Sequence, residues 1–166
     1  MTPTHRQLFF IAALACAGMM AFSLYLQEVV KLEPCPLCIV QRVFMIAIGV
    51  VALLAALHNP SLPGRRLYAG LLGLLAIGGG AAAMRQVWLQ HLPADRVPEC
   101  GPSLDYMLDA FPLSETLQLV FRGSGQCAKV DWTFLSFSIA EWTLLVFTGF
   151  LIFAGVVIFN KTLASH

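Results

Sequence analysis

Charged residues are scarce in this sequence. They make up 11% of its 166 residues, whereas hydrophobic residues make up 58%; an ordinary soluble domain is about 25% charged and about 45–50% apolar. This imbalance excludes a typical soluble domain. The net charge is only +1 at neutral pH, which argues against a basic surface for nucleic acid. The sequence also lacks a GxGxxG dinucleotide fingerprint and a CxxCH haem-attachment motif, so it carries no signal for either cofactor.

Long uncharged hydrophobic runs are what the sequence does contain. Three of them hold 18 or 19 residues, namely Leu8–Leu26, Leu67–Met84 and Trp142–Asn160. A fourth run, Leu37–Leu57, contains a single charge, Arg42, near its beginning. A helix needs about 20 apolar residues to cross a bilayer. The sequence therefore predicts an all-α membrane protein, a four-transmembrane-helix bundle forming one membrane domain over residues 1–166. The spans are expected at about 8–26, 37–57, 67–89 and 142–160.

The first run admits an alternative, a cleaved secretory leader, because His5 and Arg6 precede it. Its 19 uncharged residues exceed the usual 7–15 apolar residues of a leader, and no A-x-A-like cleavage site follows. We therefore expect the first run to be retained as a membrane span.

The connections between the spans predict the orientation of the bundle. An even number of spans places the loops 27–36 and 90–141 on one side, and both termini with the loop 58–66 on the other. Each side carries four basic residues. Those on the side of the termini lie in short segments, where the positive-inside rule is most informative. We expect cytoplasmic termini, a cytoplasmic loop at 58–66 and periplasmic loops at 27–36 and 90–141.

Five cysteines are distributed unevenly over this layout. Cys16 lies in the middle of the first span, where a free cysteine typically packs as a small hydrophobe. Cys35 and Cys38 end the first loop, and Cys100 and Cys127 lie in the long third loop. These four cysteines therefore share the outer side of the membrane. That compartment is oxidising in bacteria, so disulfides are expected there.

The motif CPLC stands at the entrance to the second span. Pro36 suits the first position of a helix, which would make Cys35 the N-cap and place Cys38 in the first turn. The exposed N–H groups and dipole of a helix N-terminus favour a thiolate. Arg42 follows Cys38 by four residues and shares its helix face. An arginine within a span predicts a functional role, although snorkelling to the interface is the alternative.

The four outer cysteines could also form a structural disulfide, a zinc site or an exchangeable loop disulfide. CPLC could be a purely structural disulfide. Four cysteines could also bind zinc, but zinc sites usually show two short spacings, and Cys100 and Cys127 lie 27 positions apart. Proline and glycine flank Cys100, and two glycines, Gly123 and Gly125, precede Cys127, which predicts exposed turns. A disulfide between them would be accessible and suited to exchange.

A short amphipathic helix is predicted within the long loop. Apolar residues recur there at helical spacing, at Leu113, Leu117, Val120 and Phe121. Its apolar face could lie on the bilayer or pack against the top of the bundle. Either arrangement would keep Cys100 and Cys127 close to the membrane surface.

This combination of features resembles the DsbB family of bacterial inner-membrane disulfide-generating proteins. The matching features are CPLC followed after four residues by Arg42, a lone loop cysteine at Cys100, and SGQCA leading into DWTFL. The four predicted spans agree with the layout of that family, so the resemblance extends over essentially the whole chain.

The resemblance implies a protein-disulfide:quinone oxidoreductase in the bacterial inner membrane, with its redox cysteines in the periplasm. A reduced dithiol protein similar to DsbA would attack a Cys100–Cys127 disulfide at Cys100. Cys127 would then engage Cys35, and Cys38 would deliver the electron pair to a membrane quinone, either ubiquinone or menaquinone.

The same resemblance implies two residues near the quinone. An arginine in the position of Arg42 assists the quinone reaction, and His91 matches a histidine at the outer end of the third span. From the residues alone, the missing dinucleotide and haem motifs also favour a lipid-soluble acceptor. Arg42 could stabilise both the Cys38 thiolate and the charge that develops on a quinone oxygen.

Two rival classes of protein remain at the level of the sequence. One is a non-enzymatic membrane transport or assembly protein whose loop disulfides are structural. The other is an enzyme similar to vitamin-K-epoxide reductase, which also combines a CxxC with loop cysteines and a quinone. The position of CPLC near the end of the first loop, with Arg42 following, favours the DsbB family.

Overall fold

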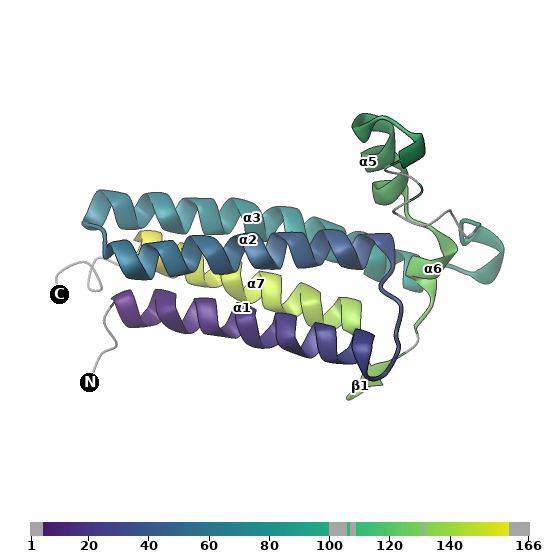
Figure 1. The fold of residues 1–166 in the computed structure, drawn as a ribbon, viewed down its shortest axis with the longest axis horizontal. Helices are drawn as coiled ribbons and strands as arrows, with labels where there is room; N and C mark the ends of the chain where they lie inside the picture. The colour runs from purple at the N-terminus through teal and green to yellow at the C-terminus, as the bar shows by residue number, and fades with distance from the viewer. Residues whose placement is uncertain (1–4, 100–105, 107–108, 131, 160–166) are drawn as a thin grey trace.

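A computed structural model describes residues 5–99, 106, 109–130 and 132–159. Within these residues, four helices are long and apolar enough to cross a membrane. They are α1 (His5–Glu28), α2 (Pro36–His58), α3 (Leu62–Gln90) and α7 (Ile139–Phe159). They run side by side along the length of the molecule (Figure 1). The predicted all-α bundle of four spans is confirmed.

The boundaries of α2 follow from local backbone chemistry. Cys35 is the N-cap, with Pro36 in the first turn, as the sequence predicted. At the other end Asn59 adopts a left-handed conformation with φ 45°, and its N–H donates to the carbonyl of Ala55. Asparagine is one of the few residues that tolerates this conformation. The chain can therefore turn tightly and enter α3 only a few residues later.

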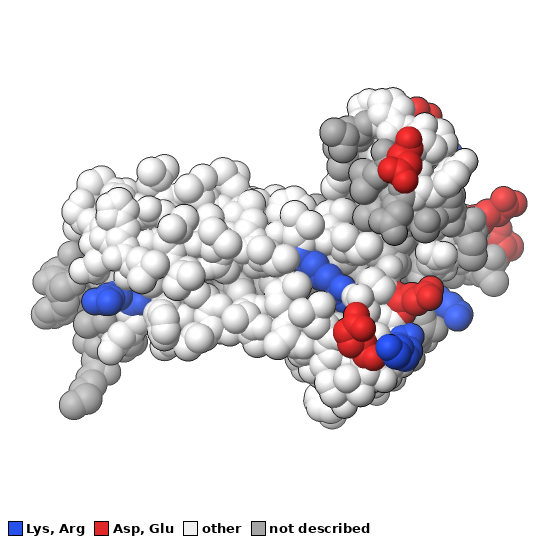
Figure 2. Space-filling view, viewed as in Figure 1, with Lys and Arg blue, Asp and Glu red and all other residues white. Residues whose placement is uncertain are grey.

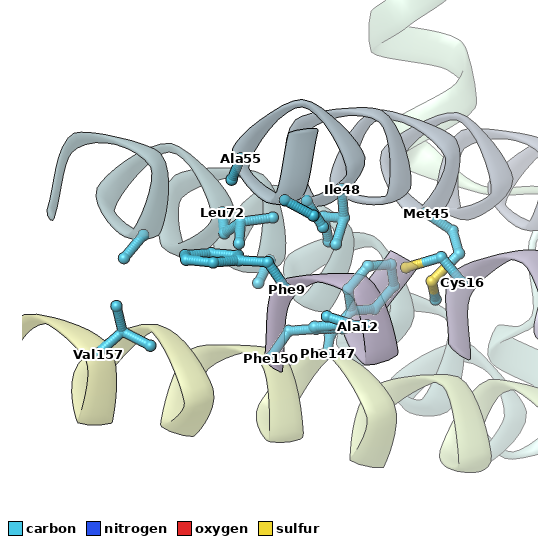
Figure 3. Close-up of a cluster of buried hydrophobic side chains, with 14 of the residues drawn as sticks. Phe9, Ala12, Cys16, Met45, Ile48, Ala55, Leu72, Phe147, Phe150 and Val157 are labelled. Carbon is cyan, nitrogen blue, oxygen red and sulfur yellow. The ribbon is translucent and has the colours of Figure 1, made fainter. Parts of the chain in front are cut away.

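The core of the bundle is built from side chains of all four long helices. Phe9 of α1 lies edge-on against Phe153 of α7, with ring centroids 5.6 Å apart. The ring of Phe147 packs directly against Gly79 of α3, and a Cβ at that position would overlap with the ring. Cys16 is 2% exposed and belongs to this core (Figure 3). The predicted packing role of Cys16 is confirmed.

The charged side chains gather toward the two ends of the bundle. Figure 2 shows an uncharged face along the helices, interrupted by one basic patch near the end that carries the long loop. Large apolar side chains are exposed along every long helix, among them Leu14, Val50, Leu74 and Ile152. An outward-facing apolar surface of this kind suits contact with lipid. The molecule is accordingly a multi-pass membrane protein.

The smaller elements lie at one end of the bundle, opposite the end where α1 begins and α7 ends (Figure 1). We call this the loop end. The elements are η1 (Ala94–Arg96), α5 (Leu113–Arg122), α6 (Gly125–Ala128), β1 (Thr133–Phe134) and β2 (Phe137–Ser138). The two strands form an antiparallel pair in which Thr133 lies opposite Ser138.

Helix α5 lies where the sequence predicts a short amphipathic helix. Val120 is 3% exposed and belongs to a buried cluster with Leu37 and Leu89 at the loop end, whereas Phe121 is 42% exposed. At Val120, therefore, the helix packs against the bundle, which was one of the two predicted arrangements. Contact between this helix and a bilayer stays a prediction.

Candidate functional site: a three-cysteine cluster beside a cavity

Cys35 and Cys38 lie together at the first turn of α2. The backbone N–H of Cys38 donates to the Cys35 sulfur at 3.3 Å, which is the N-cap interaction of the helix. The two Sγ atoms are 2.8 Å apart. Cys35 is buried and Cys38 is partly exposed. The local sequence thus places both sulfurs at the helix terminus, where unpaired N–H groups favour negative charge.

Cys127 joins this pair from the long loop. It lies in α6, is fully buried, and packs in the same cluster as Cys35. Its sulfur lies 3.9 Å from the Ser124 hydroxyl, and the neighbouring Cys35 thiol and the backbone N–H groups of Ser124 and Leu37 favour negative charge on it. The backbone at the N-terminus of α2 therefore favours negative charge on Cys127 from the long loop, as it does on the cysteines of the CPLC motif.

The hydrogen bonds around Cys127 set the acidities of two thiols. The donated bond from Cys35, helped by the N–H groups of Ser124 and Leu37, lowers the pKa of Cys127 to about 6 in spite of burial. The pKa of Cys35 is raised, because its thiol proton is held in bonds to Cys127 and Cys38 and because it is buried. These surroundings therefore favour the thiolate form at Cys127 and the thiol form at Cys35.

Two contacts hold the Cys127 segment against the bundle. Gly123 has φ 77°, and a Cβ there would overlap with the side chain of Leu89, so this position requires glycine. On α3, Arg85 donates to the backbone carbonyls of Phe121 at 3.3 Å and Arg122 at 2.9 Å. These carbonyls end α5, where a cation is favourable. Arg85 thus fixes α5 to α3 just before the chain reaches Cys127.

Two buried glutamines contact the sulfurs from inside the bundle. The Gln86 amide nitrogen is 3.3 Å from the sulfur of Cys38 and 3.5 Å from that of Cys35. Gln41 donates to the Gln86 oxygen at 2.7 Å. Neither glutamine is among the site residues that the sequence predicts. In the sequence, the only indication of these two residues is that each is a polar amide within a predicted membrane span whose other residues are mostly apolar.

A cavity of about 590 Å³ opens beside Cys38. Its lining includes Cys38, Gln41, Arg42 and Gln86, together with other polar or charged residues such as Glu33, Gln90 and Lys129. Its remaining walls are mostly apolar and come from α1, α2, α7 and the β1–β2 segment, including Met19, Met20, Leu26, Met45, Val146, Trp132, Phe134 and Trp142. Several of the aromatic rings contact one another, as Trp132 stacks on Phe134 and lies edge-on against Phe22. The site therefore combines a mostly apolar chamber with several polar groups, among them those that contact Cys38.

Arg42 lines the same cavity but is directed toward α1. Its guanidinium donates to the side-chain oxygen of Gln27 and, at 3.4 Å, to the backbone carbonyl of Ser23. Arg42 and Cys38 of the CPLC motif line the same cavity, and the predicted role of Arg42 stays a prediction. The hydrogen bonds to sulfur, however, come from Gln86 rather than from Arg42.

Two other predicted site residues stand apart from this cluster. His91 is the C-cap of α3, is exposed, and has its Nδ1 2.8 Å from the carbonyl of Val87. It is not among the residues that line the cavity, and its predicted association with a quinone stays a prediction. Cys100 lies outside the described residues.

Comparison with known proteins identifies the family. The family model described as "Disulfide bond formation protein DsbB" matches residues 5–157. The chain belongs to the DsbB family. Membership of the DsbB family therefore explains the three-cysteine cluster better than the rival interpretation, in which the chain is a transport or assembly protein with structural disulfides.

Curated DsbB relatives cover almost the same length. The chain is 54% identical to "Disulfide bond formation protein B" of Hahella chejuensis over 147 residues, which is 89% of each chain. It is 54% identical to "Disulfide bond formation protein B 1" of Pseudomonas aeruginosa strain PAO1 over 151 residues, 91% of this chain and 93% of the relative. A relative from Azoarcus sp. is 48% identical over 96% of both chains. This chain is therefore a relative of the disulfide bond formation proteins, and its family supports an oxidoreductase type of activity.

Proposed function

We propose that this protein is a thiol–quinone oxidoreductase that reoxidises a periplasmic dithiol protein similar to DsbA. The observation that carries the proposal is the position of Cys127, whose sulfur meets Cys35 at the N-terminus of α2. Cys38, the other half of the CPLC pair, borders the cavity. The sulfurs of Cys127, Cys35 and Cys38 therefore lie next to one another as the attacking, central and leaving sulfurs that thiol–disulfide exchange requires.

Electrons enter through the long loop. A thiolate of the partner attacks Cys100 in a Cys100–Cys127 disulfide, and the electron pair of the broken bond moves to Cys127. The second thiol of the partner then displaces Cys100, leaving the partner oxidised and both loop cysteines reduced. Cys127 remains as a thiolate because its surroundings favour the charged form.

The second exchange takes place within the bundle. Cys127 attacks Cys35 in the oxidised CPLC pair, a Cys35–Cys127 disulfide forms, and the electron pair of the broken bond moves to Cys38. The contact between Cys127 and Cys35 in the reduced protein is the geometry that this step needs.

The residues around the cavity fit a quinone. Its apolar walls suit a ring and an isoprenoid chain, and Arg42 and Gln86 offer hydrogen-bond donors for carbonyl oxygens at the end near Cys38. A bound quinone, whether ubiquinone or menaquinone, would supply an acceptor for two electrons and two protons. Arg42 would hold an oxygen of that acceptor and favour negative charge there. The family resemblance also implies a contact between the quinone and His91, which is the C-cap of α3 and does not line this cavity.

This activity requires a particular location. We propose the bacterial inner membrane, with both termini in the cytoplasm and the loop end in the periplasm. An oxidising compartment on the side of the cysteines is needed for their disulfides to persist.

The reaction is tested by anaerobic mixing of the purified protein with a quinone and a reduced DsbA-like protein. One quinol should form for each disulfide formed in the partner. Replacing Cys16, which packs in the core, should leave this stoichiometry unchanged. Oxidation of the partner without quinol formation, or no oxidation at all, contradicts the proposal.

The entry of electrons through Cys100 has its own test. In a Cys127→Ala variant, the free thiol of Cys100 should attack the disulfide of the oxidised partner and hold it in a covalent mixed disulfide, because Cys127 is no longer present to displace the partner. A purely structural disulfide would give no such complex. The matched control, Cys100→Ala, should trap none.

The role of Arg42 is tested separately. Arg42→Ala should preserve the fold but slow quinone reduction, while exchange between the partner and the loop cysteines continues. Unchanged quinone kinetics would remove Arg42 from the reaction.

A further inference from the structure

Gln86 and Gln41 are buried amides in helices that otherwise bury mostly apolar side chains. Gln86 of α3 is 4% exposed and Gln41 of α2 is 5% exposed. Burying an amide is unfavourable unless its hydrogen bonds are made. The bonds made here are to each other and to the sulfurs of the CPLC pair. Their burial is therefore tied to the redox site.

The contact between the two amides determines which end of Gln86 faces the sulfurs. Gln41 Nε2 donates to Gln86 Oε1 at 2.7 Å, which holds that oxygen. Gln86 Nε2 is then 3.3 Å from Cys38 Sγ and 3.5 Å from Cys35 Sγ. Cys38 Sγ also lies 3.6 Å from Gln86 Oε1. One amide thus offers an acceptor for Cys38 as a thiol and a donor for Cys38 as a thiolate.

We propose that Gln86 is a catalytic residue that donates a hydrogen bond to Cys38 as this sulfur becomes the leaving thiolate, and that Gln41 is a positioning residue that orients the amide. The inference rests on the proposed function for the step in which Cys127 attacks Cys35. In that step the Cys35–Cys38 bond breaks, the Cys35–Cys127 bond forms, and the electron pair passes to Cys38. No proton or further reactant is consumed.

The geometry explains why the charge develops on Cys38 rather than elsewhere. Cys35 is engaged in the new disulfide and is then a poor acceptor, so the amide N–H is left for Cys38. A hydrogen bond to an ionised sulfur is stronger than one between neutral groups, and a poorly hydrated site strengthens it further. Arg42 directs its guanidinium to Gln27 and Ser23 of α1. Gln86 is therefore the side chain in position to stabilise this thiolate.

The test is the thiol–disulfide equilibrium of the CPLC pair with dithiothreitol, in a full-length chain whose Cys16, Cys100 and Cys127 are replaced by alanine. Gln86→Met keeps the approximate volume but removes the donor. It should shift the equilibrium toward the disulfide by about tenfold. The shift should grow as the pH rises, because the bond is strongest when Cys38 is a thiolate. A residue that only fills space would give a shift independent of pH.

Three further variants make the test specific. Gln86→Glu is nearly isosteric but its carboxylate has no donor, so it should shift the equilibrium in the same direction. Gln41→Met, which leaves Gln86 in place, should give a smaller shift with the same pH dependence. Gln118→Met, at an exposed position of α5, is the matched control and should give none.

The outcomes separate this proposal from the proposed function. The dithiothreitol assay contains neither quinone nor partner, so quinol formation by the unmodified chain is judged independently. An equilibrium constant that is unchanged at every pH in folded Gln86→Met overturns the role of Gln86. If Gln86→Met fails to fold, unchanged constants in Gln86→Glu and Gln41→Met overturn it instead.

Discussion

Cys35, the N-cap of α2, packs with Cys127 in one buried cluster, where its thiol is a hydrogen-bonding neighbour that favours negative charge on the Cys127 sulfur. This contact joins the first turn of α2 to the short helix α6, which the chain reaches only after the long loop. It is also the largest single cause of the low pKa of Cys127. Because the donor is a thiol, the contact exists in this form only while the CPLC pair is reduced. The acidity of Cys127 should therefore depend on the redox state of its neighbour.

The first prediction concerns the pH dependence of Cys127. In the reduced protein its alkylation should have a midpoint near pH 6, with the thiolate predominating above this pH and lost below it. Cys35→Ala removes the main donor and should raise the midpoint toward the ordinary value of about 8.5. Mass spectrometry of alkylated peptides across a pH series measures both. Cys16→Ala should leave the midpoint in place, and an unchanged midpoint in Cys35→Ala would contradict the assigned cause.

The second prediction concerns Gly123. Its backbone, with φ 77° and ψ 159°, lies in a region that is essentially restricted to glycine, and other residues there cost about 1–3 kcal/mol. A Cβ would also overlap with Leu89. Gly123→Ala should displace the Cys127 segment and reduce the yield of the Cys35–Cys127 disulfide after mild oxidation. Gly149→Ala, where a Cβ meets open space, is the control. Equal yields in both variants would show that the segment is not held at Gly123.

The third prediction concerns the link between α3 and α5. Arg85→Met removes the donors to the carbonyls of Phe121 and Arg122, at a cost of about 1 kcal/mol at a helix C-terminus. That corresponds to about a fivefold increase in local opening. Amide hydrogen exchange in α5 should accelerate, and Cys35–Cys127 disulfide formation should slow, while the long helices stay protected. Arg66→Met, at the opposite end of the bundle, should change neither rate.

The fourth prediction concerns Gln27, which accepts a hydrogen bond from Arg42. Gln27→Leu releases the guanidinium from one of its partners on α1 but leaves its charge in the cavity. Quinone reduction should therefore be slowed less than in Arg42→Ala, chiefly through a higher KM for quinone. Steady-state kinetics with a short-chain quinone measure this. A loss as large as that of Arg42→Ala, confined to kcat, would mean that Gln27 acts directly rather than by positioning Arg42.

Much of the redox motif follows from local rules. The proline of CPLC suits the first turn of a helix, so both the N-cap at Cys35 and the place of Cys38 in the first turn could be predicted from four consecutive residues. The direction in which the Arg42 side chain points could not be predicted in this way, because its partners Gln27 and Ser23 belong to another helix, α1. Sequence spacing places Arg42 on the face of Cys38, but packing between α1 and α2 directs its side chain elsewhere.

The sequence by itself determined the four spans, because long uncharged runs can satisfy their backbone in a bilayer only as helices. It also determined which cysteines share one side of the membrane, since that follows from counting spans. The resemblance to the DsbB family implied that Cys127 engages Cys35, but only the tertiary structure decided that the two pack together in the fold and that Gln86, 48 positions from Cys38, supplies the amide. Such contacts depend on how helices pack and how a loop folds back on them. A single apolar span contains no periodic signal that specifies which buried polar side chain will meet a partner.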